Sequence, residues 1–268
     1  MPRQLILQLK KGGLGDHLFY SHVPRAAKES GAFGQVFISN LSHFRNPDCR
    51  RLVWELNPFV DGFRDEAGVF AEDEEVTLQP GENLLDRLML RLGIDDGRRF
   101  HEPEIFYKPT LKPELRDATV YDPNFISWVG GLAPDDIEYF FQKEKIFVDC
   151  QMKPCAGGAD ARFNLSFTSL ALTRPITILE TPTLEEFCSV IVSCKKLFCL
   201  TTGTATLAAA LGKPAVVLYG QSHDPLYRHS KLLEYVLVEP RPLPLHEKIL
   251  NRLRPLFSGA KKNEGASA

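Results

Sequence analysis

Two short segments near opposite ends of the sequence combine glycine, threonine and charged residues, and each follows an apolar run. Segment 10–17 reads Lys-Lys-Gly-Gly-Leu-Gly-Asp-His after the run 5–9. Segment 201–206 reads Thr-Thr-Gly-Thr-Ala-Thr after the run 197–200. Both patterns predict a buried strand, a tight turn and a helix start. Because a helix start offers unpaired N–H groups and the positive end of the helix dipole, each segment suits a phosphate, and we expect the two to face one cleft.

In the first segment, the glycines allow the backbone to approach a ligand closely, and an aspartate follows them. Gly12, Gly13 and Gly15, with Lys11, form the expected cleft loop. Asp16 falls at or next to the helix start, where an ionised carboxylate could accept a proton from a hydroxyl nucleophile. Asp16 could instead only cap the helix, and the spacing leaves both roles open.

The first segment does not match the common nucleotide-binding motifs. The dinucleotide fingerprint requires a glycine where Leu18 stands, and Asn40 rather than an acidic residue follows the second predicted strand. The Gly-Lys-Ser/Thr of a P-loop is also missing from the segment. A Rossmann oxidoreductase is therefore a distant alternative.

The second segment places hydroxyl groups and a bare glycine at a helix start, which indicates a diphosphate site. An ordinary capped turn is the alternative. We expect Thr202, Gly203 and Thr204 to bind the diphosphate. Further polar side chains lie in the same segment or after the predicted strand 215–219, and these could contact a sugar or nucleotide: Thr201, Thr206, Ser222 and His223.

The sequence indicates neither a metal site nor a bound cofactor. His17, His22 and His43 are not spaced as ligands on one helical face and are interpreted as packing or surface residues. The six cysteines lack the paired spacing of a zinc site and are interpreted as reduced: Cys49, Cys150, Cys155, Cys188, Cys194 and Cys199.

Composition limits the class of protein. The chain has 268 residues, 44% of them hydrophobic, and a net charge of −2. This charge argues against a general nucleic-acid binder. No apolar run reaches the roughly 18–20 residues that span a bilayer, and no secretory signal pattern is evident, so we expect a cytoplasmic protein.

Predicted strands and helices alternate along the chain, which favours parallel sheets in an α/β fold. The predicted strands are 5–9, 35–39, 60–63, 118–121, 145–149, 176–179, 197–200 and 215–219, and the predicted helices are 18–30, 49–56, 84–92, 134–142, 183–195, 204–211 and 243–257. The acidic stretch 65–75 is interpreted as a solvated loop. The proline-rich stretch 103–113 suggests a domain crossing, which gives an N-terminal Rossmann-like domain over 1–115, a C-terminal one over 116–258 and a flexible tail over 259–268.

Together the two segments resemble a known family. Lys-Gly-Gly-Leu-Gly-Asp-His-Leu at 11–18 and Thr-Gly-Thr-Ala-Thr-Leu-Ala-Ala-Ala-Leu-Gly-Lys-Pro-Ala-Val-Val-Leu-Tyr-Gly at 202–220 are similar to motifs of the heptosyltransferases, glycosyltransferase family 9. The resemblance implies the GT-B fold, in which two Rossmann-like domains face a cleft, here reduced in size. It also implies inverting transfer of a sugar from a nucleotide-diphosphate donor to a hydroxyl acceptor, without metal, with Asp16 as general base.

The sequence departs from the family at specific positions. Thr201 stands where the family motif has aspartate, and Thr206 stands where it has histidine. The lysine-tryptophan phosphate segment early in the second domain is not evident after 121–124. Sugar recognition can therefore differ from that of the heptosyltransferases.

Several functions remain open at the level of sequence. The first is a glycosyltransferase acting on a glycan or lipid-linked acceptor, as in bacterial surface glycan synthesis. The second is a degenerate nucleotide-sugar-binding protein, and the third is a nucleotide-sugar epimerase. The basic helix predicted at 243–257 could rest weakly on the inner face of a membrane or pack back on the fold.

Overall fold

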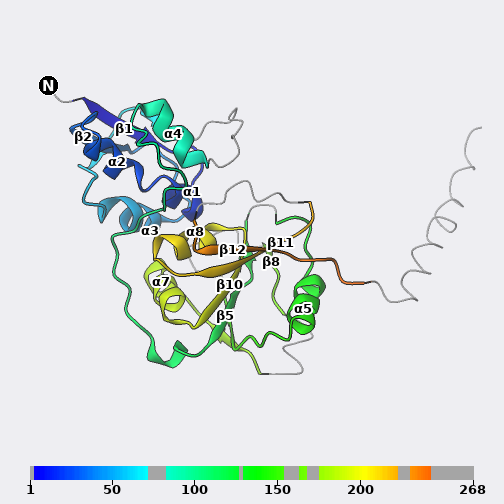
Figure 1. Cartoon of the computed structure of the whole chain (residues 1–268). Helices are drawn as coiled ribbons and strands as arrows, with labels where there is room; N and C mark the ends of the chain where they lie inside the picture. Colours follow the sequence, from blue (N-terminus) through cyan, green and yellow to red (C-terminus); the bar gives the residue numbers. More distant parts are fainter. Residues whose placement is uncertain are drawn as a thin grey trace, which may run out of the picture.

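The computed structural model describes residues 3–71, 83–126, 129–153, 163–167, 175–222 and 230–242. Two parallel sheets form two lobes in this part of the chain (Figure 1). Segment 101–112 carries neither helix nor strand and runs along the side of the molecule between them. The predicted helix 243–257, the tail 259–268, His223 and Cys155 lie outside the described residues.

The N-terminal lobe is built on a sheet of order β3-β2-β1-β4. Its strands are parallel, with Leu5 of β1 beside Val36 of β2 and Leu7 beside Val69 of β4. The elements are β1 (Gln4–Gln8), α1 (Leu14–Phe19), α2 (Val23–Glu29), β2 (Gln35–Ser39), α3 (Pro47–Cys49), the π-helical η1 (Arg50–Glu55), β3 (Phe63–Arg64), β4 (Val69–Phe70) and α4 (Leu84–Leu92).

The C-terminal lobe is built on a parallel sheet of order β12-β11-β10-β5-β7-β9. A short antiparallel pair, β6 (Asn124–Phe125) with β8 (Phe163–Asn164), lies beside it. The remaining elements are η2 (Pro113–Leu115), β5 (Thr119–Asp122), α5 (Pro134–Lys143), β7 (Cys150–Met152), β9 (Thr177–Leu179), α7 (Leu184–Ser193), β10 (Lys196–Leu200), α8 (Gly203–Ala210), β11 (Ala215–Tyr219) and β12 (Leu233–Leu237).

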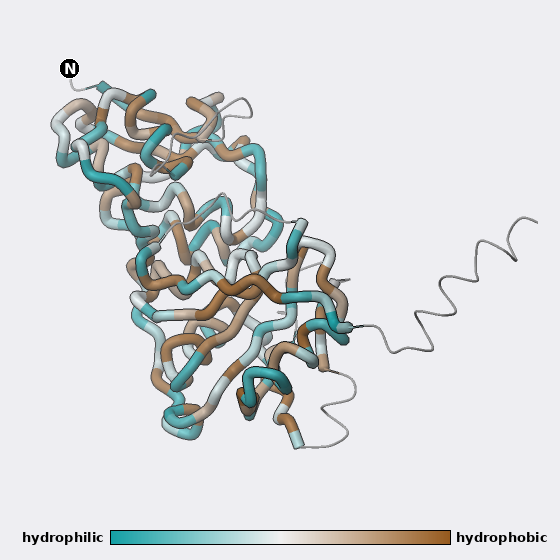
Figure 2. Tube along the Cα trace, turned by 45° about the vertical axis from the view of Figure 1, so that its right-hand side comes forward, coloured by the Kyte–Doolittle hydropathy of each residue, from teal (hydrophilic) through white to brown (hydrophobic). Residues whose placement is uncertain are grey.

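Both faces of the C-terminal sheet are covered by helices, so successive residues in the middle of its central strands are apolar on both sides. Val120 and Leu197 pack with α7 and α8 on one face. Tyr121 and Phe198, the next residues in each strand, pack with α5 on the other. Figure 2 shows the hydrophobic stretches following the strands, with hydrophilic segments on the outer connections. The predicted α/β fold of two doubly wound sheets is confirmed.

One hydrophobic core runs through both lobes. It contains Leu5 and Leu7 of β1 together with Phe187 of α7 and Leu207 of α8. Hydrogen bonds also cross between the lobes, since the N–H of Leu184 at the start of α7 donates to the carboxylate of Asp48 at 3.5 Å. The lobes are therefore packed on each other. The domain boundary at 115/116 remains a prediction.

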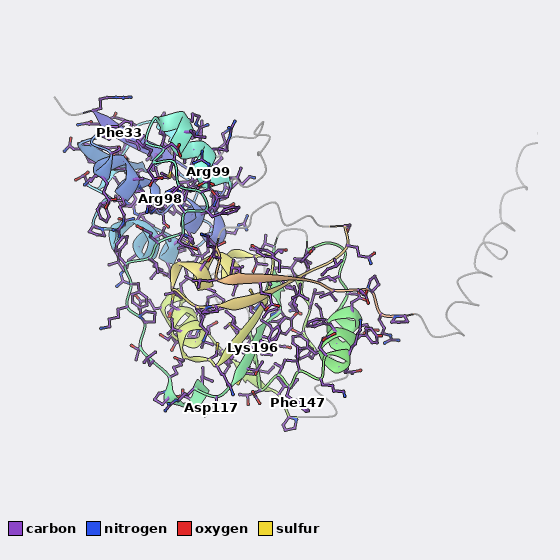
Figure 3. The ribbon with its side chains drawn as sticks, in the orientation of Figure 1. Phe33, Arg98, Arg99, Asp117, Phe147 and Lys196 are labelled. Atoms are coloured by element: carbon purple, nitrogen blue, oxygen red, sulfur yellow. The ribbon has the colours of Figure 1, made fainter. Side chains whose placement is uncertain are left out.

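Several predicted elements differ from the structure. The predicted helix 18–30 is two helices, because the chain turns between α1 and α2 and Pro24 lies in the first turn of α2. The predicted strand 145–149 is wrong: Lys145 has a positive φ of 53° where the chain leaves α5, and the strand begins only at Cys150. In the connection between them, Phe147 is 66% exposed and lies at the outer end of the C-terminal lobe (Figure 3).

Other elements were missed altogether. β4 lies within the acidic stretch 65–75, which was interpreted as a loop. No strand was predicted at the position of β12. Among the described residues, no helix combines the length and apolar character that a membrane crossing requires.

Candidate active site

The first residues of α1 and α8 are in contact where the two lobes meet. A Cβ atom on Gly15 would lie 2.9 Å from Cα of Gly203, and a Cβ atom on Gly203 would lie 2.8 Å from N of Gly15. Only residues without a side chain allow this approach. Figure 1 shows the two helices side by side between the sheets. The two glycine segments therefore meet, while their role in lining a ligand cleft remains a prediction.

This contact lies at the carboxyl ends of the strands, where ligands bind in doubly wound folds. In the C-terminal sheet the chain runs from β5 outward through β7 to β9 and then returns to β10 on the other side of β5. The order therefore reverses between β5 and β10. Asn124 follows β5 and Thr201 follows β10 at this edge of the sheet.

Asp16 is the third residue of α1 and is half-buried. Its Oδ2 accepts a hydrogen bond from the N–H of Gly13 at 3.2 Å. The capping role is therefore present, and the negative carboxylate stabilises the positive end of α1. Asp16 also stands next to Gly15, where the lobes meet.

Thr202 caps α8 at the other side of the contact. Its Oγ1 accepts a hydrogen bond from the N–H of Thr204 at 3.3 Å. The hydroxyl of Thr204 is directed away from the helix axis and donates to Oδ2 of Asp122 at 2.5 Å. Thr206 is 4% exposed, and its Oγ1 would lie 3.6 Å from a Cβ on Gly15. The structure thus brings Thr202, Gly203 and Thr206 to the contact, while Thr204 fixes the helix start to β5.

Asp122 is a residue of this site that the sequence analysis did not single out. It ends β5, is 1% exposed, and its Oδ1 accepts from the backbone N–H of Asn124 at 3.2 Å and from its side-chain amide at 2.5 Å. Burial raises the pKa of the Asp122 carboxyl group, and the hydrogen bonds from Thr204 and Asn124 offset only part of this effect. Its partner Thr204 is distant in sequence, so no local pattern points to it.

Two buried polar atoms at this edge of the sheet have no hydrogen-bond partner among the described residues. They are Oγ1 of Thr201 and Oδ1 of Asn124. Buried polar atoms are normally hydrogen-bonded, so unpaired ones beside a helix start are suited to receive hydrogen bonds from a bound molecule. Thr201 is among the residues predicted to contact a sugar or nucleotide.

Gly12 allows a second loop to pack against the first glycine segment. A Cβ atom on Gly12 would lie 2.8 Å from Nδ1 of His43. Below this contact, the side chain of His17 is fully buried. Its Nδ1 accepts from Nε1 of Trp54 at 2.9 Å, so its Nε2–H donates to the carbonyl of His43 at 2.9 Å. The interpretation of His17 as a packing residue is confirmed. Lys11 is exposed at the edge of the turn.

The loop after β11 packs against the segment before α5. Gly130 has φ of +86°, and a Cβ atom on Gly220 would lie 2.2 Å from its carbonyl oxygen. The N–H of Gly220 donates to the carbonyl of Val129 at 2.9 Å. Ser222 is exposed in this loop, and the predicted contact of His223 lies outside the described residues.

Across the described ranges, no group of three or more His, Cys, Asp or Glu side chains could hold a metal ion. The five described cysteines are buried and free, and burial raises the pKa of the Cys199 thiol well above its usual range. The interpretation of these five as reduced core residues is confirmed.

Comparisons with known proteins support the fold. No protein-family model and no curated protein matches the sequence. Among solved structures, the chain is similar to a glycosyl transferase family 9 protein from Veillonella parvula, with a TM-score of 0.59, 10% identity and coverage of 97% of this chain and 98% of that one.

Two Escherichia coli structures are also similar over nearly the whole chain. The ADP-heptose lps heptosyltransferase II matches with a TM-score of 0.56 and 14% identity over 95% of this chain and 99% of its own. The heptosyltransferase WaaC with ADP matches with a TM-score of 0.53 and 11% identity over 95% and 99%. The chain therefore has the GT-B-like two-domain fold of these enzymes, as the resemblance implied.

Proposed function

We propose that the protein is an inverting glycosyltransferase that moves a sugar from a nucleotide-diphosphate donor to a hydroxyl group of an acceptor. The observation that carries the proposal is the contact of Gly15 with Gly203. Through it, a turn bearing the Asp16 carboxylate faces a helix start bearing backbone N–H groups. The shared fold with glycosyltransferase family 9 structures supports this assignment.

In this proposal the C-terminal lobe binds the donor. Thr202 and Gly203 hold the diphosphate at the start of α8, and the dipole of α8 stabilises negative charge there. The bond between the anomeric carbon and the diphosphate oxygen breaks with its electron pair on the diphosphate. Charge on the leaving group grows in this step, so stabilisation by fixed N–H groups lowers the barrier.

The N-terminal lobe supplies the base. Asp16 accepts the proton of the acceptor hydroxyl as its oxygen forms the bond to the anomeric carbon. Attack opposite the departing diphosphate inverts the configuration. The acceptor in this proposal is a glycan, free or lipid-linked, and no bound cofactor takes part. Since Thr201 and Thr206 replace the acidic and imidazole groups of the family motif, the sugar need not be heptose.

Binding of the donor is tested with a panel of nucleoside diphosphates that includes ADP, because a similar structure is described with ADP. A ligand that binds only the folded state at 100 times its Kd stabilises it by about 2.7 kcal/mol. For a chain of this size we expect a rise in Tm of about 5 °C or more for at least one member. If no nucleoside diphosphate raises the Tm, the proposal is wrong.

Catalysis is tested with Asp16→Asn. We expect loss of transfer by about 10²- to 10⁴-fold, with the nucleoside-diphosphate shift retained. Product analysis separates the alternatives, since an epimerase changes the donor sugar without an acceptor. A wild-type protein that binds nucleoside diphosphates but turns over no nucleotide sugar would be a binding protein. Unchanged transfer in Asp16→Asn would remove Asp16 from the mechanism.

A further inference from the structure

The loop after β2 is fixed against the first glycine segment. The N–H of Leu9 donates to Oγ of Ser42 at 3.1 Å, the N–H of His43 donates to the carbonyl of Leu9 at 2.9 Å, and the N–H of Arg45 donates to the carbonyl of Gly12 at 3.0 Å. The ring of Phe44 stacks on His17 with centroids 4.6 Å apart. The backbone of Arg45 therefore has a defined position beside the turn.

The side chain of Arg45 extends toward the turn that carries Asp16. A Cβ atom on Gly13 would lie 4.0 Å from Nη1 of Arg45 and 2.8 Å from Oδ2 of Asp16. The guanidinium group and the carboxylate thus flank the same residue, two positions before the interlobe contact at Gly15. Arg45 therefore belongs to the part of the candidate active site that the N-terminal lobe forms.

This guanidinium group has no hydrogen bond or ion pair with any residue in the described part of the chain, although the side chain is half-buried. Other arginines of the lobe are paired: Arg25 with Glu104 at 2.8 Å, and Arg50 with Glu55 at 3.0 Å. Arginine stays charged at all physiological pH values. Partial removal of an unpaired charge from water is unfavourable, so a fixed cation here is suited to an anion that arrives from solution.

We infer that Arg45 binds an anionic oxygen, from a phosphate or a carboxylate, of a molecule bound beside Asp16. The planar guanidinium group can hold two such oxygens at once. The inference rests on the proposed function for the identity of the molecule, which is either the donor, through its diphosphate, or an anionic acceptor. The anion site itself depends only on the geometry of Arg45.

The two sources are distinguished with Arg45→Gln, Arg45→Lys and the control Arg116→Gln. Arg116 is exposed and lies next to Asp117, at the end of the C-terminal lobe far from the N-terminal lobe (Figure 3). Circular dichroism and Tm without ligand establish that each variant is folded. Affinities are then measured for the most stabilising nucleoside diphosphate, for its nucleoside, and for inorganic phosphate with and without that nucleoside diphosphate.

If the anion belongs to the donor, Arg45→Gln weakens binding of the nucleoside diphosphate by about 10- to 100-fold and leaves the nucleoside unchanged. If it belongs to the acceptor, the nucleoside-diphosphate affinity stays the same, but inorganic phosphate stabilises the saturated wild type and not Arg45→Gln. In either case Arg45→Lys keeps part of the effect, because the charge remains.

The inference is overturned if Arg45→Gln and Arg116→Gln bind both probes equally. Failure of the proposed function gives a different result, namely a wild-type protein that binds no nucleoside diphosphate. Arg45 is then judged by inorganic phosphate alone, which should stabilise the wild type and Arg116→Gln but not Arg45→Gln.

Discussion

Asp122 links the end of β5 to the start of α8, the two elements that position the C-terminal side of the candidate site. It ends β5 and holds Thr204 in the first turn of α8, so one carboxyl group fixes the helix start relative to the sheet. Because it is fully buried, its protonation state is tied to folding. The pKa of Asp122 in the folded protein lies above its ordinary value of 3.8. The folded state therefore holds the proton more tightly than the unfolded state does.

This sign gives a prediction for stability against pH. The contribution of Asp122 to the free energy of unfolding is fully present below pH of about 3.8 and is lost as pH rises through the higher pKa of the folded state. Asp122→Asn keeps the shape and can still accept from Asn124. We expect the stability of Asp122→Asn, relative to the wild type, to rise with pH across this window. Urea unfolding at a series of pH values measures this difference, and a difference that stays constant or falls with pH would contradict it.

Single residues of the site were predictable to different degrees. Asp16, Gly203 and the threonines belong to short segments that follow apolar runs, so the position of these segments after strand ends can be read from local sequence. Asp122 and Arg45 could not be identified in this way, because each is placed in the site by contacts with a distant segment. Asp122 contacts Thr204, and Arg45 contacts the turn at Gly12 and Gly13.

The two helix starts form one structural unit because glycine stands at both points of contact. Gly15→Ala places a methyl group 2.9 Å from a backbone atom of Gly203, so one helix must shift. We expect a loss of stability of about 1–3 kcal/mol, as for other overpacked contacts, and weaker nucleoside-diphosphate binding. Urea unfolding and thermal shift measure the two effects.

Gly13→Ala is the matched control in the same turn. Its Cβ would meet side-chain atoms only, Oδ2 of Asp16 at 2.8 Å and Nη1 of Arg45 at 4.0 Å. Side-chain ends can move, so Gly13→Ala should be less destabilising than Gly15→Ala. Equal stabilities for the two variants would show that α1 and α8 are not held in close contact in solution.

At the level of elements, the sequence was most informative where an apolar run is bounded by clear turns. β1, β2, β10 and β11 were predicted within a residue or so for this reason. β7 was misplaced because Ile146, Phe147 and Val148 look like a strand locally, although the turn at Lys145 assigns them to the connection. β4 is too short and too close to acidic residues to produce a pattern.

The shared hydrophobic core sets how the whole molecule unfolds. Two Rossmann-like lobes joined only by a linker could unfold separately. Here Leu7 of β1 and Leu207 of α8 belong to one buried cluster, and the ion pair of Arg51 with Glu185 and the bond from Leu184 to Asp48 cross the same boundary. Apolar burial dominates the free energy of folding, so the two lobes should stabilise each other.

We therefore predict a single cooperative unfolding transition. Leu7→Ala in the N-terminal lobe and Ile137→Ala in α5 of the C-terminal lobe each remove a side chain that is 0% exposed, at an expected loss of about 2–5 kcal/mol. Each should lower the Tm of the whole molecule by several degrees, as followed by circular dichroism for both lobes and by tryptophan fluorescence in a Trp128→Phe background, which leaves Trp54 of the N-terminal lobe as the only tryptophan. A fluorescence transition that keeps its midpoint in Ile137→Ala would show that the N-terminal lobe unfolds independently. The two lobes would then be separate folding units.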